Sequence, residues 1–175
     1  YIGAAGELKT KPTQHSVMRL REIGIQPDVL LCRSEKKISS SIKKKIGLFC
    51  DVEEEAVIEA RDVQVIYEVP LVFKGEKLDQ VICKKLGLKY DGKRNLEDWK
   101  HNVVEKALRP KKIVKIALVG KYVELLDAYK SIYESLWHAG MALDARVRIK
   151  RVNAEKLDNQ SVAAQLKGMQ GILVP

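Results

Sequence analysis

Short runs of apolar residues alternate along this chain with longer amphipathic stretches, and this alternation limits the fold more than any other feature. A short apolar run favours a strand of a parallel sheet, which is covered on both faces. An amphipathic stretch between two such runs favours a helix that connects them. The pattern therefore predicts an α/β fold with strands at residues 29–32, 56–58, 113–119, 146–152 and 171–174.

Helices are predicted between the strands, where apolar residues recur at about every third or fourth position. Residues 66–70 are expected to be extended instead, because Val69 precedes a proline and this position disfavours the α conformation. In the last helix before the basic segment RPKK, Trp99, Val103 and Leu108 are expected to share one apolar side. The predicted helices cover residues 17–23, 39–49, 78–86, 96–108, 128–139 and 161–169.

The basic segment RPKK at 109–112 contains a helix breaker and is predicted to link two domains. Residues 1–88 are expected to belong to the first domain, and residues 89–112 to form a helix and the linker. The strand–helix rhythm then restarts, so residues 113–175 are expected to open a doubly wound α/β domain. Three strands are few for that class, and we expect both ends of the sequence to lie inside longer domains.

The charge balance favours anionic partners and the composition argues against several classes of protein. Lys and Arg total 32 against 23 acidic residues, which gives a net charge of +9. Aromatic residues make up only 6% of the chain and do not interleave with the basic ones, so no nucleic-acid partner is predicted. No apolar run is long enough for a membrane span and no signal-peptide pattern is visible, so we expect a cytoplasmic protein without a membrane partner.

The three cysteines give no sign of a metal site or a disulfide framework. Cys32, Cys50 and Cys83 are widely spaced and form no CxxC pair. We expect reduced thiols, and no metal site is predicted in this segment.

A cluster of polar residues near the start of the sequence is the first candidate binding site. Lys9 and Lys11 lie just ahead of a helix start at Pro12, where backbone N–H groups and the helix dipole favour an anion. With the Thr13 hydroxyl they predict a phosphate site, and Gln14 is a candidate partner for a base or a ribose. The alternative is a capped helix start with solvated lysines, and the residues alone leave both readings open.

Further candidates follow the predicted strands. Arg33 comes directly after a buried strand, where ligands of open α/β sheets gather, and an arginine there suits a phosphoryl group. Asp62 lies in a loop after the next strand and is a candidate acceptor for an adenine amino group or a ribose. The alternative for both is an ordinary loop position. Among the three lysines at 43–45, the pattern alone does not say which one meets a ligand.

Several of these segments together resemble one known family. Residues 6–16 read GELKTKPTQHS and are similar to the GE-x-KTKPTQHS signature of the CTP synthases. GIQPDVLLCRS at 24–34 resembles a second block of that family at the expected spacing. Further matches follow in order to VGKY at 119–122 and DAYKS at 127–131, so the resemblance covers essentially the whole chain.

The resemblance implies an ATP-dependent carbon–nitrogen ligase of the glutamine amidotransferase type. The family aminates UTP to CTP, the last step of de novo CTP synthesis, through a 4-phosphorylated UTP and with ammonia from glutamine. It uses ATP with Mg²⁺, is activated by GTP and inhibited by CTP, and is usually a homotetramer. The implied fold is the end of a P-loop-type, dethiobiotin-synthetase-like amidoligase domain, followed by the first strands and helices of a flavodoxin-like class I glutaminase domain.

The resemblance also assigns roles to residues. The phosphate loop, the Mg²⁺ ligands and the glutaminase nucleophile would lie outside this segment, so the chain alone is expected to be inactive. The rival reading is a non-catalytic basic module that binds nucleotides or RNA. The implied UTP/CTP-binding residues are Lys9, Thr10, Lys11, Pro12, Thr13, Gln14 and Lys45; the ATP-binding residues are Arg61, Asp62 and Val63; and Arg33 is the implied catalytic residue near the reacting phosphoryl group.

Overall fold

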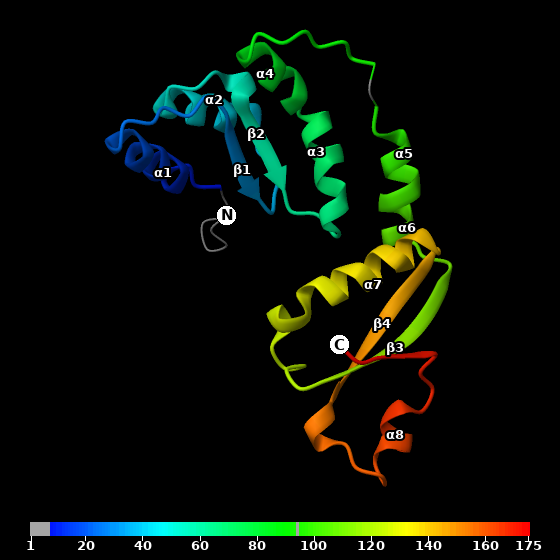
Figure 1. The fold of residues 1–175 in the computed structure, drawn as a ribbon. Coiled ribbons are helices and arrows are strands. Elements are labelled where there is room, and N and C mark those ends of the chain that lie inside the picture. The colour runs from blue at the N-terminus through cyan, green and yellow to red at the C-terminus, as the bar shows by residue number, and fades with distance from the viewer. Residues whose placement is uncertain (1–7, 94) are drawn as a thin grey trace. The chain divides into compact units, whose positions relative to one another are not determined.

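The computed structural model describes residues 8–93 and 95–175, which form two compact units (Figure 1). The first unit is Tyr1–Leu96 and the second is Glu97–Pro175. The division falls inside the segment 89–112 that was predicted to hold a helix and a linker. Both units mix helices with parallel strands, so the predicted α/β class with parallel sheets is confirmed.

In the first unit two parallel strands lie between helices. β1 (Leu30–Ser34) pairs with β2 (Val57–Arg61), with Leu30 opposite Val57 and Ser34 opposite Arg61. Figure 1 shows α2 (Ser40–Cys50) on one side of the strands and α3 (Val69–Gly75) on the other. α1 (Lys11–Glu22) packs on α2, and α4 (Leu78–Lys85) follows α3. The core of this unit contains Val17, Cys32, Ile38, Ile46, Cys50 and Val57.

Local signals explain where α2 begins and ends. The Ser39 hydroxyl accepts a hydrogen bond from the backbone N–H of Ile42 at 3.4 Å, which caps the helix. At the other end Asp51 adopts the left-handed conformation. Within the helix, a Cβ on Gly47 would lie 2.7 Å from the carbonyl oxygen of Val52. A side chain is therefore excluded at Gly47, and the short helix η2 (Glu54–Ala56) packs close against α2.

The expectation of an extended segment at 66–70 is wrong. The structure has a 3₁₀ turn, η3 (Ile66–Glu68), that leads directly into α3. Pro70 lies in the first turn of α3, where its missing N–H costs nothing and its fixed φ suits a helix start. The Glu68 carboxylate accepts the backbone N–H groups of Gln64 and Val65, both at 3.0 Å, and stabilises the turn ahead of the helix.

The expectation that the strand at 29–32 is buried on both faces is also wrong. In β1 Cys32 and Ser34 are buried, whereas Leu31 is 53% exposed. One face of β1 is covered by α1 and α2, while α3 packs on the neighbouring strand β2. Leu31 is therefore apolar without being buried within this unit.

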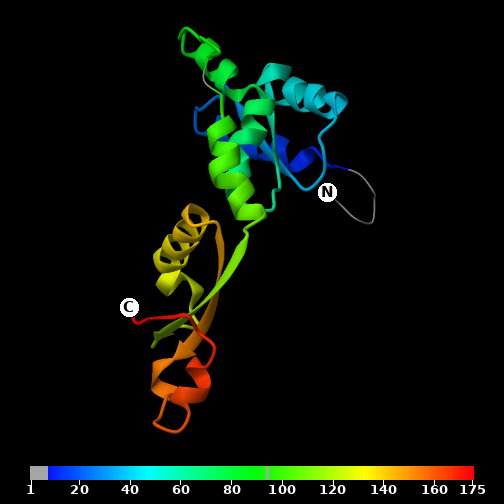
Figure 2. The ribbon, with the colours of Figure 1, turned by 90° about the vertical axis from the view of Figure 1, so that its right-hand side faces the viewer.

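The second unit has a three-stranded parallel sheet in the order β4–β3–β5. β3 (Lys112–Gly120) is central, β4 (Ala145–Asn153) pairs along its whole length, and β5 (Gly171–Leu173) pairs on the other side. α7 (Lys130–Ala142) lies against one face of the sheet in both ribbon views (Figure 2). Shorter elements complete the unit: η5 (Leu126–Tyr129), η6 (Ala154–Lys156) and α8 (Val162–Leu166).

The helix expected at 96–108 is present but contains a wider turn. α5 (Glu97–Trp99) continues into the π-helical turn η4 (Lys100–Val104) and then into α6 (Glu105–Leu108). Val103 was predicted to lie on the buried side of this helix. Val104 is buried instead, with 4% of its surface exposed. A π turn holds one residue more than an α turn, so the period of 3.6 fails across it.

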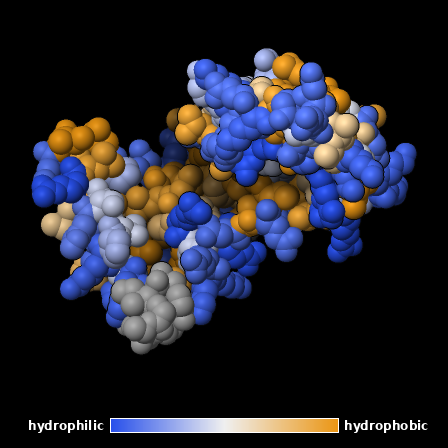
Figure 3. All heavy atoms as spheres, turned by 90° about the horizontal axis from the view of Figure 1, so that it is seen from below, coloured by the Kyte–Doolittle hydropathy of each residue, from blue (hydrophilic) through white to orange (hydrophobic). Residues whose placement is uncertain are grey.

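Apolar side chains also reach the surface, among them Leu48 and Phe49 of α2. The space-filling view shows hydrophobic residues between the hydrophilic ones (Figure 3). Within residues 8–93 and 95–175, no helix combines the length and the apolarity that crossing a membrane requires.

Candidate functional site at the carboxyl ends of β1 and β2

The carboxyl ends of β1 and β2 bring two of the predicted segments together. Arg33 is the fourth residue of β1 and lies opposite Ala60 of β2. Arg61 ends β2, and Asp62 follows it. The backbone N–H of Asp62 donates to the carbonyl oxygen of Ser34 at 3.0 Å, which extends the pairing of the strands by one bond. Ligands of parallel sheets gather at this edge.

A cavity of about 530 Å³ opens at this edge, and we call it the strand-end cavity. It contains Arg33 and all three residues of the segment to which the resemblance assigned ATP. Its remaining wall is apolar and comes from Ala60 of β2, from η3 and from α3, which suits a flat ring better than a charged group. The lining residues are Arg33, Ala60, Arg61, Asp62, Val63, Ile66, Val69, Val72 and Phe73.

Sequence reasoning missed the apolar wall of the strand-end cavity. The residues from Ile66 to Phe73 were expected to begin with an extended segment, which would not present these side chains together. The available signal was Pro70, since proline is also common in the first turn of a helix. The acidic Glu68 just before it is a second helix-start signal.

An ion pair at the mouth of the strand-end cavity joins the two strands. Arg33 Nε donates to Asp62 Oδ1 at 2.7 Å, and the side chains are 84% and 40% exposed. This hydrogen bond, together with the charge of the carboxylate, raises the pKa of Arg33 further above its ordinary value. Arg61 Nε lies 3.8 Å from Oε1 of Glu59, so the two arginines of the cavity have different partners.

The predicted UTP/CTP-binding residues at the start of α1 differ in their exposure to solvent. Thr10 is 8% exposed, and its hydroxyl accepts a hydrogen bond from Gln14 Nε2 at 3.1 Å. The Gln14 amide is therefore engaged within the helix, and contact with a base would require this bond to be exchanged. Lys9, Lys11 and Pro12 are exposed. The first turn of α1 thus presents cationic side chains at its surface, as the phosphate-site hypothesis requires.

A second, smaller cavity of about 350 Å³ lies between α1 and β1, and we call it the α1 cavity. Of the predicted UTP/CTP residues it contains Pro12 and Thr13, and it also contains Arg33. Arg33 therefore lines both this cavity and the strand-end cavity. The α1 cavity is lined by Pro12, Thr13, Ser16, Val17, Leu20, Leu30, Leu31, Cys32 and Arg33.

Lys45 is not brought to this place. It is exposed on α2 and lines none of the four cavities described in residues 8–93 and 95–175. Its neighbour Lys43 is half-buried and forms an ion pair with Glu76. The structure thus separates the lysines at 43–45 by their surroundings, but it does not place Lys45 beside the other predicted residues.

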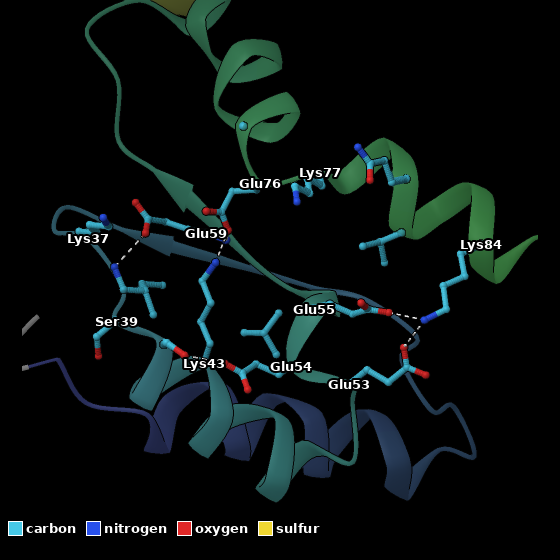
Figure 4. Close-up of a pocket in the computed structure, with 16 residues that line it drawn as sticks. Lys37, Ser39, Lys43, Glu53, Glu54, Glu55, Glu59, Glu76, Lys77 and Lys84 are labelled. Carbon is cyan, nitrogen blue, oxygen red and sulfur yellow. Dashed lines mark hydrogen bonds and ion pairs between the residues drawn. The ribbon is translucent and has the colours of Figure 1, made fainter. Parts of the chain in front are cut away.

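A cavity of about 1240 Å³, the largest of the four described in residues 8–93 and 95–175, lies beside β2 and was not foreseen; we call it the edge cavity (Figure 4). It is bordered by the start of α2, by η2, by β2, by the end of α3 and by α4. In Figure 4 Lys43 points toward Glu76, and Lys84 points toward Glu55 and Glu53. The charged residues of the edge cavity are Lys37, Lys43, Lys77, Lys84, Glu53, Glu54, Glu55, Glu59 and Glu76.

Several charged side chains of the edge cavity are paired or hydrogen-bonded. Burial raises the pKa of Glu76, but hydrogen bonds from Lys43 and from the backbone N–H of Glu59 outweigh burial, and the net pKa is lowered. Glu59 is 5% exposed and accepts the backbone N–H of Ile38 at 2.9 Å. Glu54 accepts the Ser40 hydroxyl at 2.7 Å. The carboxylates are therefore engaged in holding neighbouring elements in place.

Clusters of metal-binding side chains and the two core cysteines would be possible reactive sites in residues 8–93 and 95–175. No group of three or more His, Cys, Asp and Glu side chains there is arranged to hold a metal ion. Cys32 and Cys50 are buried in the core, and burial raises the pKa of both thiols, which disfavours the reactive thiolate.

Two parallel strands flanked by helices, with arginines and a cavity at their carboxyl ends, are consistent with a nucleotide-binding α/β domain. Residues 1–88 match the family model described as CTP synthase N-terminus. The chain belongs to the CTP synthase family, and the resemblance seen in the sequence is confirmed.

Relatives match over the full length of the chain. The CTP synthase of Bdellovibrio bacteriovorus is 54% identical, that of Syntrophus aciditrophicus 53%, and that of Ruminiclostridium cellulolyticum 51%. Each alignment covers 100% of this chain and 32% of the relative. The chain therefore spans about a third of the length of the relatives that it matches.

Proposed function

We propose that this chain is part of an ATP-dependent carbon–nitrogen ligase that aminates UTP to CTP with ammonia from glutamine. The reaction would pass through a UTP phosphorylated on its 4-oxygen, and the chain alone would be inactive. The relatives named CTP synthase support this over all 175 residues. The structural observation that supports it best is the position of Arg33, which lines both the strand-end cavity and the α1 cavity.

The two cavities suit the two nucleotides of such a reaction. In the strand-end cavity, Arg61, Asp62 and Val63 with the apolar wall of α3 would bind the adenosine part of ATP. At the α1 cavity, the segment from Lys9 to Gln14 would bind the triphosphate of UTP or of CTP, with Lys45 as a further cation. Arg33 would then lie near the phosphoryl group that passes between the nucleotides. Phosphoryl transfer is catalysed mainly by positioning and charge stabilisation, which are tasks for an arginine.

Mg²⁺ would accompany ATP and neutralise charge on its phosphates. Among residues 8–93 and 95–175, Asp62 is the one carboxylate that lines the strand-end cavity, and it is paired with Arg33. The Mg²⁺ ligands and the phosphate loop would therefore lie outside this segment. GTP activation and a homotetramer are part of the same proposal.

The second unit would be the opening of a flavodoxin-like class I glutaminase domain. Its parallel order β4–β3–β5, with α7 connecting β3 to β4, supports an α/β domain of that class. We propose the division into a synthetase part at 1–88, a helix and linker at 89–112, and a glutaminase part at 113–175. The strand β5 and the residues after it would then lead toward the glutaminase active site.

Replacing Lys11 in the full-length protein tests the proposal. CTP formation from UTP, ATP, Mg²⁺ and ammonia is followed by chromatography. Lys11→Ala should raise the KM for UTP and weaken CTP inhibition together, each by about tenfold, since a charge-assisted hydrogen bond contributes about 1.5 kcal/mol or more. Arg19→Ala, which removes an exposed cation from the same helix, is the matched control.

Two results would contradict the proposal. A full-length protein that forms no CTP under these conditions would remove the ligase function. Binding to generic RNA with a steep salt dependence, and no preference for UTP or CTP, would favour the basic binding module instead.

A further inference from the structure

In the ion pair of Arg33 and Asp62, the position of Asp62 is the more restricted of the two. The backbone N–H of Asp62 is bonded to Ser34 at the end of the paired strands, so the position of its Cα is fixed by the sheet. Arg33 has a long side chain that is 84% exposed. Its guanidinium is located by the bond from Nε to Asp62 Oδ1 at 2.7 Å.

The role of this pair is not mainly to stabilise the fold. Ion pairs at such exposure add little to folding stability, because water screens the charges and the long side chain loses conformational freedom. The pair nevertheless fixes one orientation of the guanidinium of a residue that lines both cavities. An exposed interaction that orients a side chain at a cavity is more useful for binding than for folding.

The bond to Asp62 leaves much of the guanidinium available. Arginine has five N–H donors, and the pair with Asp62 uses the one on Nε. Among the described residues, no hydrogen bond from the terminal nitrogens of Arg33 is present. These two nitrogens can therefore bind a phosphoryl group side by side, the arrangement that arginine favours.

We infer that Asp62 is a positioning residue that holds Arg33 by Nε and directs its terminal nitrogens to a phosphoryl group between the two cavities. The inference rests on the proposed function and goes beyond the adenosine contact assigned to Asp62. It also explains why a carboxylate is tolerated at a phosphate-binding edge, since Arg33 neutralises it. Asp62 then acts on the reaction through Arg33.

A double-mutant cycle in the full-length protein tests this inference, with kcat and the KM values for ATP and UTP as readouts. Asp62→Asn keeps the shape but weakens the bond to Nε. We expect kcat to fall by about tenfold with each KM changed less than about twofold, because misplacing a catalytic group affects the transition state more than ground-state binding. Asp62→Glu, which keeps the charge, should recover part of kcat.

The decisive comparison is the double variant Arg33→Ala with Asp62→Asn. If Asp62 acts through Arg33, the double variant should have the same kcat as Arg33→Ala alone. Independent, multiplying losses would overturn the inference, and so would an Asp62→Asn variant that changes only the KM for ATP. Glu22→Gln, which breaks the exposed Arg19–Glu22 pair of 2.6 Å away from the cavities, should leave kcat unchanged.

The two proposals fail in different ways. A wild-type protein without CTP synthesis would overturn the proposed function and this inference with it. An active wild type whose kcat does not respond to Asp62→Asn would overturn only the inference. Thermal unfolding of each variant checks the fold, which should be retained because Asp62 is linked to the sheet through its backbone.

Discussion

The edge cavity and the strand-end cavity of the first unit differ in what their charges do. The edge cavity is more than twice as large, and among its lining residues Lys43 pairs with Glu76 and Lys84 pairs with Glu53 and Glu55. The strand-end cavity has few charges, an apolar wall, and an arginine whose terminal nitrogens face no partner among the described residues. The two cavities therefore differ in which donors they leave available, and the proposed ATP site is the smaller of the two.

The largest expected effect would come from removing Arg33. Arg33→Ala in the full-length protein should lower kcat by about a hundredfold, as the loss of one donor to a developing charge does. Lys84→Ala, which removes a cation from the edge cavity, should leave kcat unchanged because its partners are Glu53 and Glu55 of the same cavity. Steady-state kinetics of CTP formation measures both. Equal losses in the two variants would abolish the distinction between the cavities.

A change in the edge cavity should instead affect stability. Glu76→Gln removes the charge that pairs with the half-buried Lys43, and we expect a loss of about 2 kcal/mol in the free energy of unfolding. Denaturant unfolding of the full-length protein, followed by a probe in the first unit, measures it.

The double replacement Lys43→Met with Glu76→Gln is the control for this experiment. It should recover part of the loss, because no unpaired charge remains buried. A Glu76→Gln variant as stable as the wild type, with reduced kcat, would mean that the edge cavity has a catalytic role after all.

The smallest expected effect is a dependence on pH. The pKa of Glu76 is lowered in the folded protein, so its contribution to stability is complete above the ordinary carboxyl value of 4.5 and is lost as the pH falls through the folded value. Between neutral pH and acid, the wild type should lose more stability than Glu76→Gln. Unfolding curves at several pH values compare them, and parallel losses would mean that Glu76 does not contribute.

Much of the fold was predictable because periodic apolar patterns report strands and helices directly. β3 and α4 lie within one residue of their predicted bounds, for instance, because both have strong patterns. The wrong predictions have local causes. A proline at position 70 disfavours helix at the residue before it, but proline is also common in the first turn of a helix. The π turn moves the buried position from Val103 to Val104. Periodicity does not distinguish such cases.

The polar residues of the strand-end cavity were candidates from the sequence, but their arrangement and the apolar wall were not predicted. Arg33 and Asp62 were both candidates from sequence, but their pairing joins residues 29 positions apart and depends on strand register. The Lys43–Glu76 pair joins residues 33 positions apart, and no sequence pattern predicted it. The apolar wall was hidden by the wrong expectation for 66–70. What sequence lacks is the set of contacts that the parallel pairing creates.

The early start of α3 has a consequence for how a ligand would bind. Pro70, the Glu68 carboxylate and the packing of α3 on β2 hold this turn, so Ile66, Val69 and Phe73 are in place before anything enters the cavity. A flat ring that binds there would not have to order this segment. The entropic cost of ordering it is part of folding and does not reduce the binding affinity. Preorganisation of this kind favours a shape-selective pocket over one that adapts to many guests.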